Sequence, residues 1–190
     1  MEKPYRKMPP IYLGDYMLRT IKKSDAKDMF EYGKNIEVTR YLNWGPFHTL
    51  SEAKKSIKNI FYPRLKEELP IGYAIIDVKS LKMIGTIDFH SKMKGENGAE
   101  IGFVLHIDYW NKGIMTNALD AMIKIGFEYL GYEHLKIKHL KSNIASQKVI
   151  EKSGFKFVKV EPYSIEKYHR ILRDELLTYE LLKEDYHGNQ

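Results

Sequence analysis

Apolar residues recur at helical spacing in four parts of the chain. Two of these segments, at about 24–33 and 49–68, lie in the first 70 residues, and the other two, at about 116–130 and 143–154, lie in the second half. Apolar residues three and four positions apart share one face of a helix. We therefore expect four amphipathic helices that pack against a common core.

Shorter runs of alternating or continuous apolar residues predict seven strands. They cover about residues 16–21, 71–78, 83–90, 99–107, 134–140, 155–161 and 175–183. The helix at 116–130 lies between the strands 99–107 and 134–140, so this crossover should place the two strands parallel and side by side. We expect a mixed α/β fold with a mostly antiparallel central sheet of about seven strands and four helices.

The chain has 190 residues, and it contains no repeat or linker that would separate two domains. We expect residues 1–190 to form one domain, with residues 1–14 as an extended arm because Pro4, Pro9 and Pro10 disfavour regular structure. No apolar run approaches the ~20 residues that span a bilayer. The absence of cysteine fits a reducing environment, so we expect a cytoplasmic protein without membrane contact, disulfides or thiolate metal sites.

The formal net charge is +6, and part of the excess is local. The segment from Lys141 to Arg173 contains eight basic residues and three acidic ones. This excess of positive charge could attract an anionic ligand, or it could form a basic surface exposed to solvent. The sequence has no dense basic tract, zinc finger or RNA-binding motif. We expect no direct nucleic-acid partner and no metal.

A glycine-containing loop follows the strand 99–107 and precedes the helix 116–130. This loop, Trp110-Asn-Lys-Gly-Ile-Met115, would leave backbone N–H groups and the positive end of the helix dipole pointing at one place, which favours an anion. Taken alone, it is also compatible with an ordinary strand-to-helix turn. It lacks the Gly-Lys-Ser/Thr ending of a nucleoside-triphosphate loop and the three glycines of a dinucleotide fingerprint.

A second motif, Asn143-Ile-Ala-Ser-Gln-Lys-Val-Ile-Glu-Lys-Ser-Gly-Phe155, lies about thirty residues after the loop. Together the two motifs resemble the Gcn5-related N-acetyltransferase (GNAT) superfamily, and within it the RimJ/RimL-like ribosomal-protein N-terminal acetyltransferases. The segments that carry the resemblance are 99–103, 109–119, 143–146 and 151–155, in the same order as in the family. The resemblance implies the acyl-CoA N-acyltransferase fold, in which two central strands splay apart at a bulge in the strand that corresponds to 99–107.

The resemblance also implies acetyl-CoA as the donor and a primary amine as the acceptor, for example the N-terminal amine of a ribosomal protein. Asn143 would bind the pantetheine arm, Ser146 would lie near the thioester, and Lys152, with Lys148, would lie near the 3′-phosphate. The backbone of one strand segment would bind the pantetheine, and the glycine loop would bind the pyrophosphate. The strand segment consists of Phe103, Val104 and Leu105. The loop residues are Asn111, Lys112, Gly113, Ile114, Met115 and Thr116.

The chain departs from the family pattern at three positions. Trp110 and Met115 replace the usual outer residues of the loop, as in many members of the Rim-type branch. Ile150 stands where many relatives have a tyrosine that acts as the general acid. Ser146, or a water that it holds, then becomes the candidate that protonates the departing thiolate.

Glu100 is the candidate general base, acting directly or through water, since the attacking amine must lose a proton. The alternative is a structural carboxylate paired with a nearby Lys or Arg. Asp88 and His90 on the neighbouring strand are further candidates for the base. For acceptor binding we expect side chains from segments 35–48 and 163–174 together with His90. The residues named for this role are Trp44, His90, Tyr168 and Asp174.

Two other functions remain open at this point. One is acetylation of a small molecule, such as a polyamine, an antibiotic or an amino-acid-like amine. The other is a CoA-binding module without catalysis, which the replacement of the tyrosine by Ile150 suggests. Homodimers are common in the superfamily, so a homodimer is one expected assembly.

Overall fold

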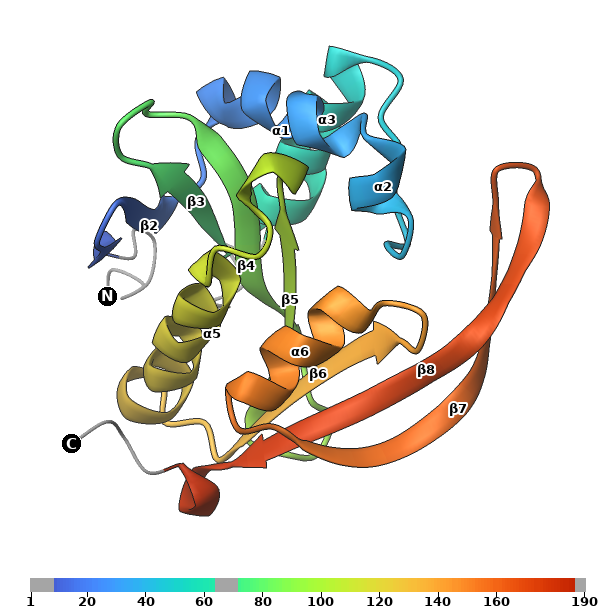
Figure 1. The fold of residues 1–190 in the computed structure, drawn as a ribbon. Helices are drawn as coiled ribbons and strands as arrows, with labels where there is room; N and C mark the ends of the chain where they lie inside the picture. The colour runs from blue at the N-terminus through green and yellow to red at the C-terminus, as the bar shows by residue number, and fades with distance from the viewer. Residues whose placement is uncertain (1–8, 64–71, 187–190) are drawn as a thin grey trace.

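The structure is a computed structural model that describes residues 9–63 and 72–186. Within these residues the chain forms an eight-stranded sheet in the order β1-β2-β3-β4-β5-β6-β8-β7 (Figure 1). The strands are β1 (Ile11–Leu13), β2 (Tyr16–Thr20), β3 (Tyr73–Asp77), β4 (Met83–Lys92), β5 (Gly98–Leu105), β6 (His134–Leu140), β7 (Lys156–Lys167) and β8 (Arg170–Leu182). Among these described strands, only β5 and β6 pair in parallel. The predicted mixed α/β fold and the parallel pair are confirmed.

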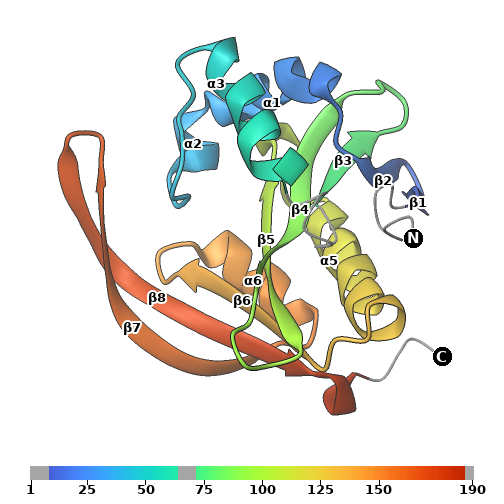
Figure 2. The ribbon, with the colours of Figure 1, turned by 180° about the vertical axis from the view of Figure 1, so that it is seen from behind.

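Helices cover both faces of the sheet. They are α1 (Ala26–Gly33), α2 (Ile36–Thr39), α3 (Leu50–Ser56), α5 (Ile114–Lys124) and α6 (Ile144–Lys152), and α3 and α5 continue as π-helical turns over Ile57–Phe61 and Ile125–Tyr129. Figure 1 shows α5 and α6 on one face, and Figure 2 shows α1 and α3 on the other. The end of the predicted helix 49–68 lies outside the described residues.

Alternation along the strands divides the core in two. Ile75 packs in the cluster under α5 with Leu119 and Met122, whereas its neighbour Ile76 packs in the cluster under α1 and α3 with Met29. Successive strand residues point to opposite faces, so each central strand contributes to both clusters. This explains why the central strands read as continuous apolar runs.

The last part of the expected extended arm at residues 1–14 is a strand of the sheet. Ile11–Leu13 form β1, which pairs with β2 through Ile11 with Leu18 and Leu13 with Tyr16. Ile11 and Leu13 share one face and pack against the core. Pro9 and Pro10 precede this edge strand, where a missing N–H removes no ladder hydrogen bond.

The two central strands diverge. β5 pairs with β6 only as far as Ile101 with Ile137, and beyond this point β5 continues along β4 while β6 continues along β8 (Figure 2). The predicted splay is therefore present. The bulge, however, lies on β4 and not on the strand 99–107, because Phe89 pairs with Ile101 and Ser91 pairs with Glu100. The extra residue, His90, bends β4 at this point.

A long hairpin spans residues 163–174, which lie between the predicted strands 155–161 and 175–183. β7 and β8 pair from Lys156 to the tip, where Tyr168 and His169 form the turn with φ of 56° and 58°. Figure 1 shows that the hairpin projects from the sheet and bends back toward α2. Pro162 disfavours a strand in a sequence-based prediction. In the structure, however, this proline lies on the edge strand β7, where proline is tolerated.

Candidate functional site

Two cavities open where β5 and β6 diverge. The first, which we call the loop cavity, has a volume of about 590 Å³ and lies between β5, the segment 109–116 and the start of α6. The second, the carboxylate cavity, has a volume of about 410 Å³ and contains the side chains of Glu100 and Asp88 among its lining. Phe103, Val104, Asn143 and Ser146 line both cavities. The two cavities therefore meet between β5 and the start of α6, beyond the last paired residues of β5 and β6.

The loop cavity has the features of an anion site. α5 starts at Ile114, its N-cap is Gly113 with a left-handed φ of 73°, and no side chain caps the first turn. The N–H groups of that turn have no carbonyl partner within the helix, and the helix dipole adds positive potential. Asn111 also has a left-handed φ, of 60°, which turns the loop toward the helix. Phosphate groups bind readily at such a helix start.

Lysine side chains add positive charge to the loop cavity. Lys112, Lys148 and Lys152 line it, and the ammonium of Lys112 lies 5.1 Å from the centre of the Tyr109 ring. The cavity also contains Glu37. The three lysines outnumber this carboxylate, so the cavity suits a polyanionic ligand.

Trp110 fixes the loop to β5. Its indole N–H donates to the carbonyl oxygen of Leu105 at 2.8 Å. The sequence indicated Trp110 only as a departure from the usual loop, and this bond gives it a structural role. Phe103, Val104 and Leu105 line the loop cavity on the side where β5 has no strand partner.

The start of α6 lies at the junction of the cavities. The Oδ1 atom of Asn143 caps the helix and accepts from the backbone N–H of Ser146 at 3.2 Å. Ser146 therefore has a fixed backbone position between the cavities. Ile150 is fully buried in the core and lines neither cavity, so the side chain at the tyrosine position of the family cannot take part in the chemistry.

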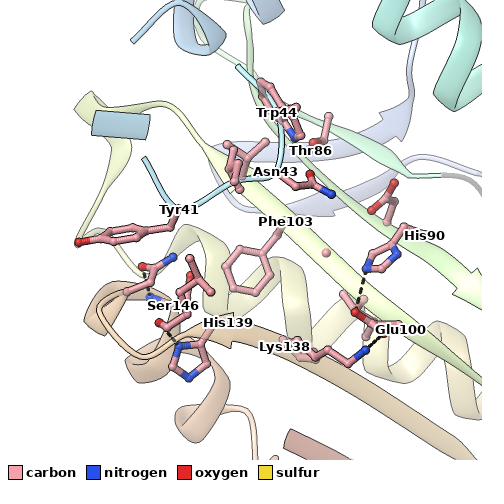
Figure 3. A pocket seen from close by; sticks show the side chains of 18 of the residues that line it. Tyr41, Asn43, Trp44, Thr86, His90, Glu100, Phe103, Lys138, His139 and Ser146 are labelled. Atoms are coloured by element: carbon pink, nitrogen blue, oxygen red, sulfur yellow. Dashed lines mark hydrogen bonds and ion pairs between the residues drawn. The ribbon is translucent and has the colours of Figure 1, made fainter. Parts of the chain in front are cut away.

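Glu100 faces the carboxylate cavity and is held by two basic side chains. Its Oε2 atom lies 2.9 Å from Nζ of Lys138, and its Oε1 atom lies 3.4 Å from Nε2 of His90 (Figure 3). Burial raises the pKa of the Glu100 carboxyl, but the hydrogen bonds and charges of His90 and Lys138 lower it by more. The pKa therefore lies below its ordinary value, and Glu100 is ionised at neutral pH. The sequence did not indicate Lys138.

A second histidine, His139, lies near the same junction. Its Nδ1–H donates to the carbonyl oxygen of Leu140 at 2.8 Å, and its Nε2 atom is buried without a hydrogen-bond partner. Burial lowers the pKa of His139 below its ordinary value, so the imidazole is neutral at neutral pH.

The four residues expected to bind the acceptor are divided between two cavities. Trp44 and His90 line the carboxylate cavity. Tyr168 and Asp174 line a third cavity of about 240 Å³, which lies between the hairpin and residues 40–42. The third cavity borders the carboxylate cavity, and the two share Tyr41, Leu42, Leu140 and Tyr163.

Residues 9–63 and 72–186 contain neither a cluster of metal ligands nor a membrane-spanning helix. No group of three or more His, Cys, Asp or Glu side chains in this part of the chain could hold a metal ion. None of the helices described there is long and apolar enough to cross a membrane.

The chain belongs to the acetyltransferase (GNAT) domain family, whose sequence model matches residues 16–156. It is 30% identical over 183 residues to the uncharacterized N-acetyltransferase p20 of Bacillus licheniformis, and the match covers 95% of this chain and 100% of p20. As a member of this family, the chain is an acetyl-CoA-dependent N-acetyltransferase.

Solved structures share the fold at low sequence identity. The ribosomal-protein-S5-alanine acetyltransferase of Vibrio fischeri superposes with a TM-score of 0.76 and 20% identity, covering 95% of this chain and 100% of that one. The microcin C7 self-immunity acetyltransferase MccE, solved with acetyl-CoA and AMP, superposes with a TM-score of 0.76 and 18% identity, covering 90% and 93% of the two chains. At these identities the comparison establishes the fold.

Proposed function

We propose that acetyl-CoA binds in the loop cavity and that a primary amine enters through the carboxylate cavity to receive the acetyl group. The observation that carries this proposal is the junction of the two cavities at Phe103, Val104, Asn143 and Ser146. A donor and an acceptor that approach from opposite faces of the splay would meet there. Holding the two reactants in contact supplies a large part of the rate, about 7–11 kcal/mol in well-oriented reactions.

The loop cavity fits the donor part by part. The uncapped first turn of α5 and Lys112 would bind the pyrophosphate, and Lys148 and Lys152 would attract the 3′-phosphate. The open side of Phe103–Leu105 would hold the pantetheine arm as an added strand holds to a sheet edge. The donor supplies the activated thioester, and the chain supplies position and charge.

Proton transfer is assigned to groups at the junction. Glu100, ionised in the carboxylate cavity, would attract a protonated amine and accept its proton directly or through water. The hydroxyl of Ser146 would donate to the departing thiolate. A thiol has a pKa near 8.5, so its thiolate is a good leaving group and needs only modest assistance.

We further propose that the acceptor is an extended molecule, such as the N-terminus of a ribosomal protein or another polypeptide. The support is the third cavity, which prolongs the carboxylate cavity along the hairpin by about 240 Å³. A polypeptide end would place its amine near Glu100 and its next residues against Tyr163 and Tyr168. A compact amine would leave this extension empty.

Release of CoA, followed with a thiol-reactive dye, tests the proposal on a panel of acceptors. The panel holds peptides with free N-termini, the same peptides with blocked N-termini, polyamines and amino acids. We expect the free peptides to give the highest kcat/KM and the blocked peptides none. Faster turnover of small amines would establish a small-molecule enzyme, and binding of CoA without turnover of any amine would indicate a non-catalytic module.

A further inference from the structure

A buried lysine joins the tip of the hairpin to the segment after α2. Lys167 is 9% exposed, and its Nζ atom donates to the carbonyl oxygens of Thr39 at 2.6 Å, Leu42 at 2.8 Å and Trp44 at 3.0 Å. The ammonium group has three donor protons, so these three carbonyls satisfy it completely. The contacts join parts of the chain that are 123 to 128 residues apart.

In the part of the chain that the structure describes, the ammonium of Lys167 is bound by backbone oxygens and not by a carboxylate. Lys167 forms no ion pair with a carboxylate among the described residues. Burial lowers the pKa of its ammonium below the ordinary value. A buried charge is costly unless it is fully hydrogen-bonded, and here only backbone oxygens provide those bonds. The position of the three carbonyls is thereby tied to the position of the hairpin tip.

The segment that Lys167 holds is a wall of the site. Tyr41, Leu42, Asn43 and Trp44 all line the carboxylate cavity. Tyr41 and Leu42 also line the third cavity and the loop cavity, whereas Asn43 and Trp44 line the carboxylate cavity alone among the three. The hairpin contributes Tyr163 to the same two cavities. Two walls from distant parts of the sequence therefore face one another, and Lys167 is the polar contact that connects them near the tip.

We propose that Lys167 is a positioning residue that sets the width of the acceptor cavity and so the fit of the acceptor. The inference rests on the proposed function, because it assigns the carboxylate and third cavities to the acceptor. Lys167 lines none of the three cavities, so it would contact neither substrate directly. Its effect reaches the acceptor through the Tyr41–Trp44 wall.

Lys167→Met tests the proposal because it keeps the apolar stem and removes the three donors. We expect the KM for the acceptor to rise on the order of tenfold, since small displacements of a positioning wall cost rate steeply. The KM for acetyl-CoA should rise less than the acceptor KM, because β5, the segment 109–116 and α6 supply most of the loop cavity and only Tyr41 and Leu42 of the wall reach it. The matched control is Lys159→Met on the same strand, an exposed lysine paired with Glu161 at 2.9 Å.

Hydrogen exchange and a second variant separate positioning from general stability. In Lys167→Met the amides of residues 39–44 should exchange faster, while those of α5 and α6 keep their wild-type rates. Lys167→Arg keeps the charge, but a planar guanidinium cannot point at three converging carbonyls as an ammonium does, so it should also raise the acceptor KM. Wild-type kinetics in Lys167→Arg and Lys167→Met, or an equal rise of both KM values, would overturn the inference.

Failure of the proposed function is a different observation. It would appear in the wild-type protein as no CoA release with any amine. Failure of the inference would appear as an active wild-type protein whose acceptor KM does not change in the Lys167 variants.

Discussion

The ammonium of Lys138 lies 2.9 Å from a carboxylate oxygen of Glu100, across the point where β5 and β6 separate. Lys138 is the first residue of β6 beyond the last parallel pair, Ile101 with Ile137. The ion pair therefore spans the start of the splay on the side of the carboxylate cavity. Together with His90, this pair lowers the pKa of the Glu100 carboxyl, whereas burial raises it.

The first prediction concerns this pair. Lys138→Met removes a hydrogen bond and a positive charge that lower the pKa of Glu100, so that pKa should rise. Because the ionised form is the active one, the acidic limb of kcat/KM against pH should move to higher pH. The control is Lys136→Met on the same strand, whose lysine pairs with Glu180 at 3.1 Å. An acidic limb that stays in place in both Lys138→Met and Glu100→Gln would exclude Glu100 as the titrating base.

The second prediction concerns the glycine loop. Gly113→Ala forces a side chain into a left-handed conformation, which costs about 1 kcal/mol or more and disturbs the start of α5. We expect a higher KM for acetyl-CoA and an unchanged KM for the acceptor. Gly95→Ala is the matched control, since Gly95 has a φ of 77°, also has open space around it and lies in an exposed turn outside the cavities. Equal donor KM values in the two variants would contradict the assignment.

The third prediction concerns the acid. Ser146→Ala should lower kcat by about 10²-fold, the small end of the range for general acid–base catalysis, because a thiolate leaves readily. The Kd for CoA should change little, since the capping contact uses the backbone N–H of Ser146. Ser153→Ala, near the other end of the same helix, is the control for helix stability. A full kcat in Ser146→Ala would assign the proton to a water.

The parts of the molecule that the sequence predicted are those set by local patterns. The amphipathic faces of α5 and α6 and the Gly113 turn depend on neighbouring residues, and the crossover rule then places β5 beside β6. The parallel pair of β5 and β6 followed from these features. The residues expected to bind acetyl-CoA came from the resemblance to the family, and their role stays a prediction.

The remaining features depend on contacts between distant residues. Glu100 and Lys138 are brought together by strand register, and a one-residue slip would separate them. The Lys167 contact uses backbone carbonyls, which every residue has and which leave no signal in the sequence. The bulge was expected on β5 but lies on β4 at His90. The alignment of the two paired strands decides which of them carries the extra residue, and the sequence does not show this alignment.

The fourth prediction concerns stability and pH. Burial lowers the pKa of His139, so the unfolded chain binds a proton more tightly than the folded chain. The stability linked to this group is fully present above its ordinary pKa, near 6.5, and is lost as the pH falls below that value. His139→Gln should therefore flatten the decrease of the unfolding free energy as the pH falls below about 6.5, where one group contributes a slope of up to about 1.4 kcal/mol per pH unit.

Urea unfolding at a series of pH values measures this slope. The control is His48→Gln, which removes an exposed imidazole outside the cavities and should keep the wild-type profile. A wild-type slope in His139→Gln would show that His139 is not the group responsible.

The most direct test of the account is mass spectrometry of an amine acceptor after incubation with the protein and acetyl-CoA. We expect the free N-terminus of a peptide to gain one acetyl group, at a rate that falls in Glu100→Gln and Ser146→Ala. An unmodified acceptor across the whole amine panel, with CoA bound and the protein folded, would contradict the proposed reaction.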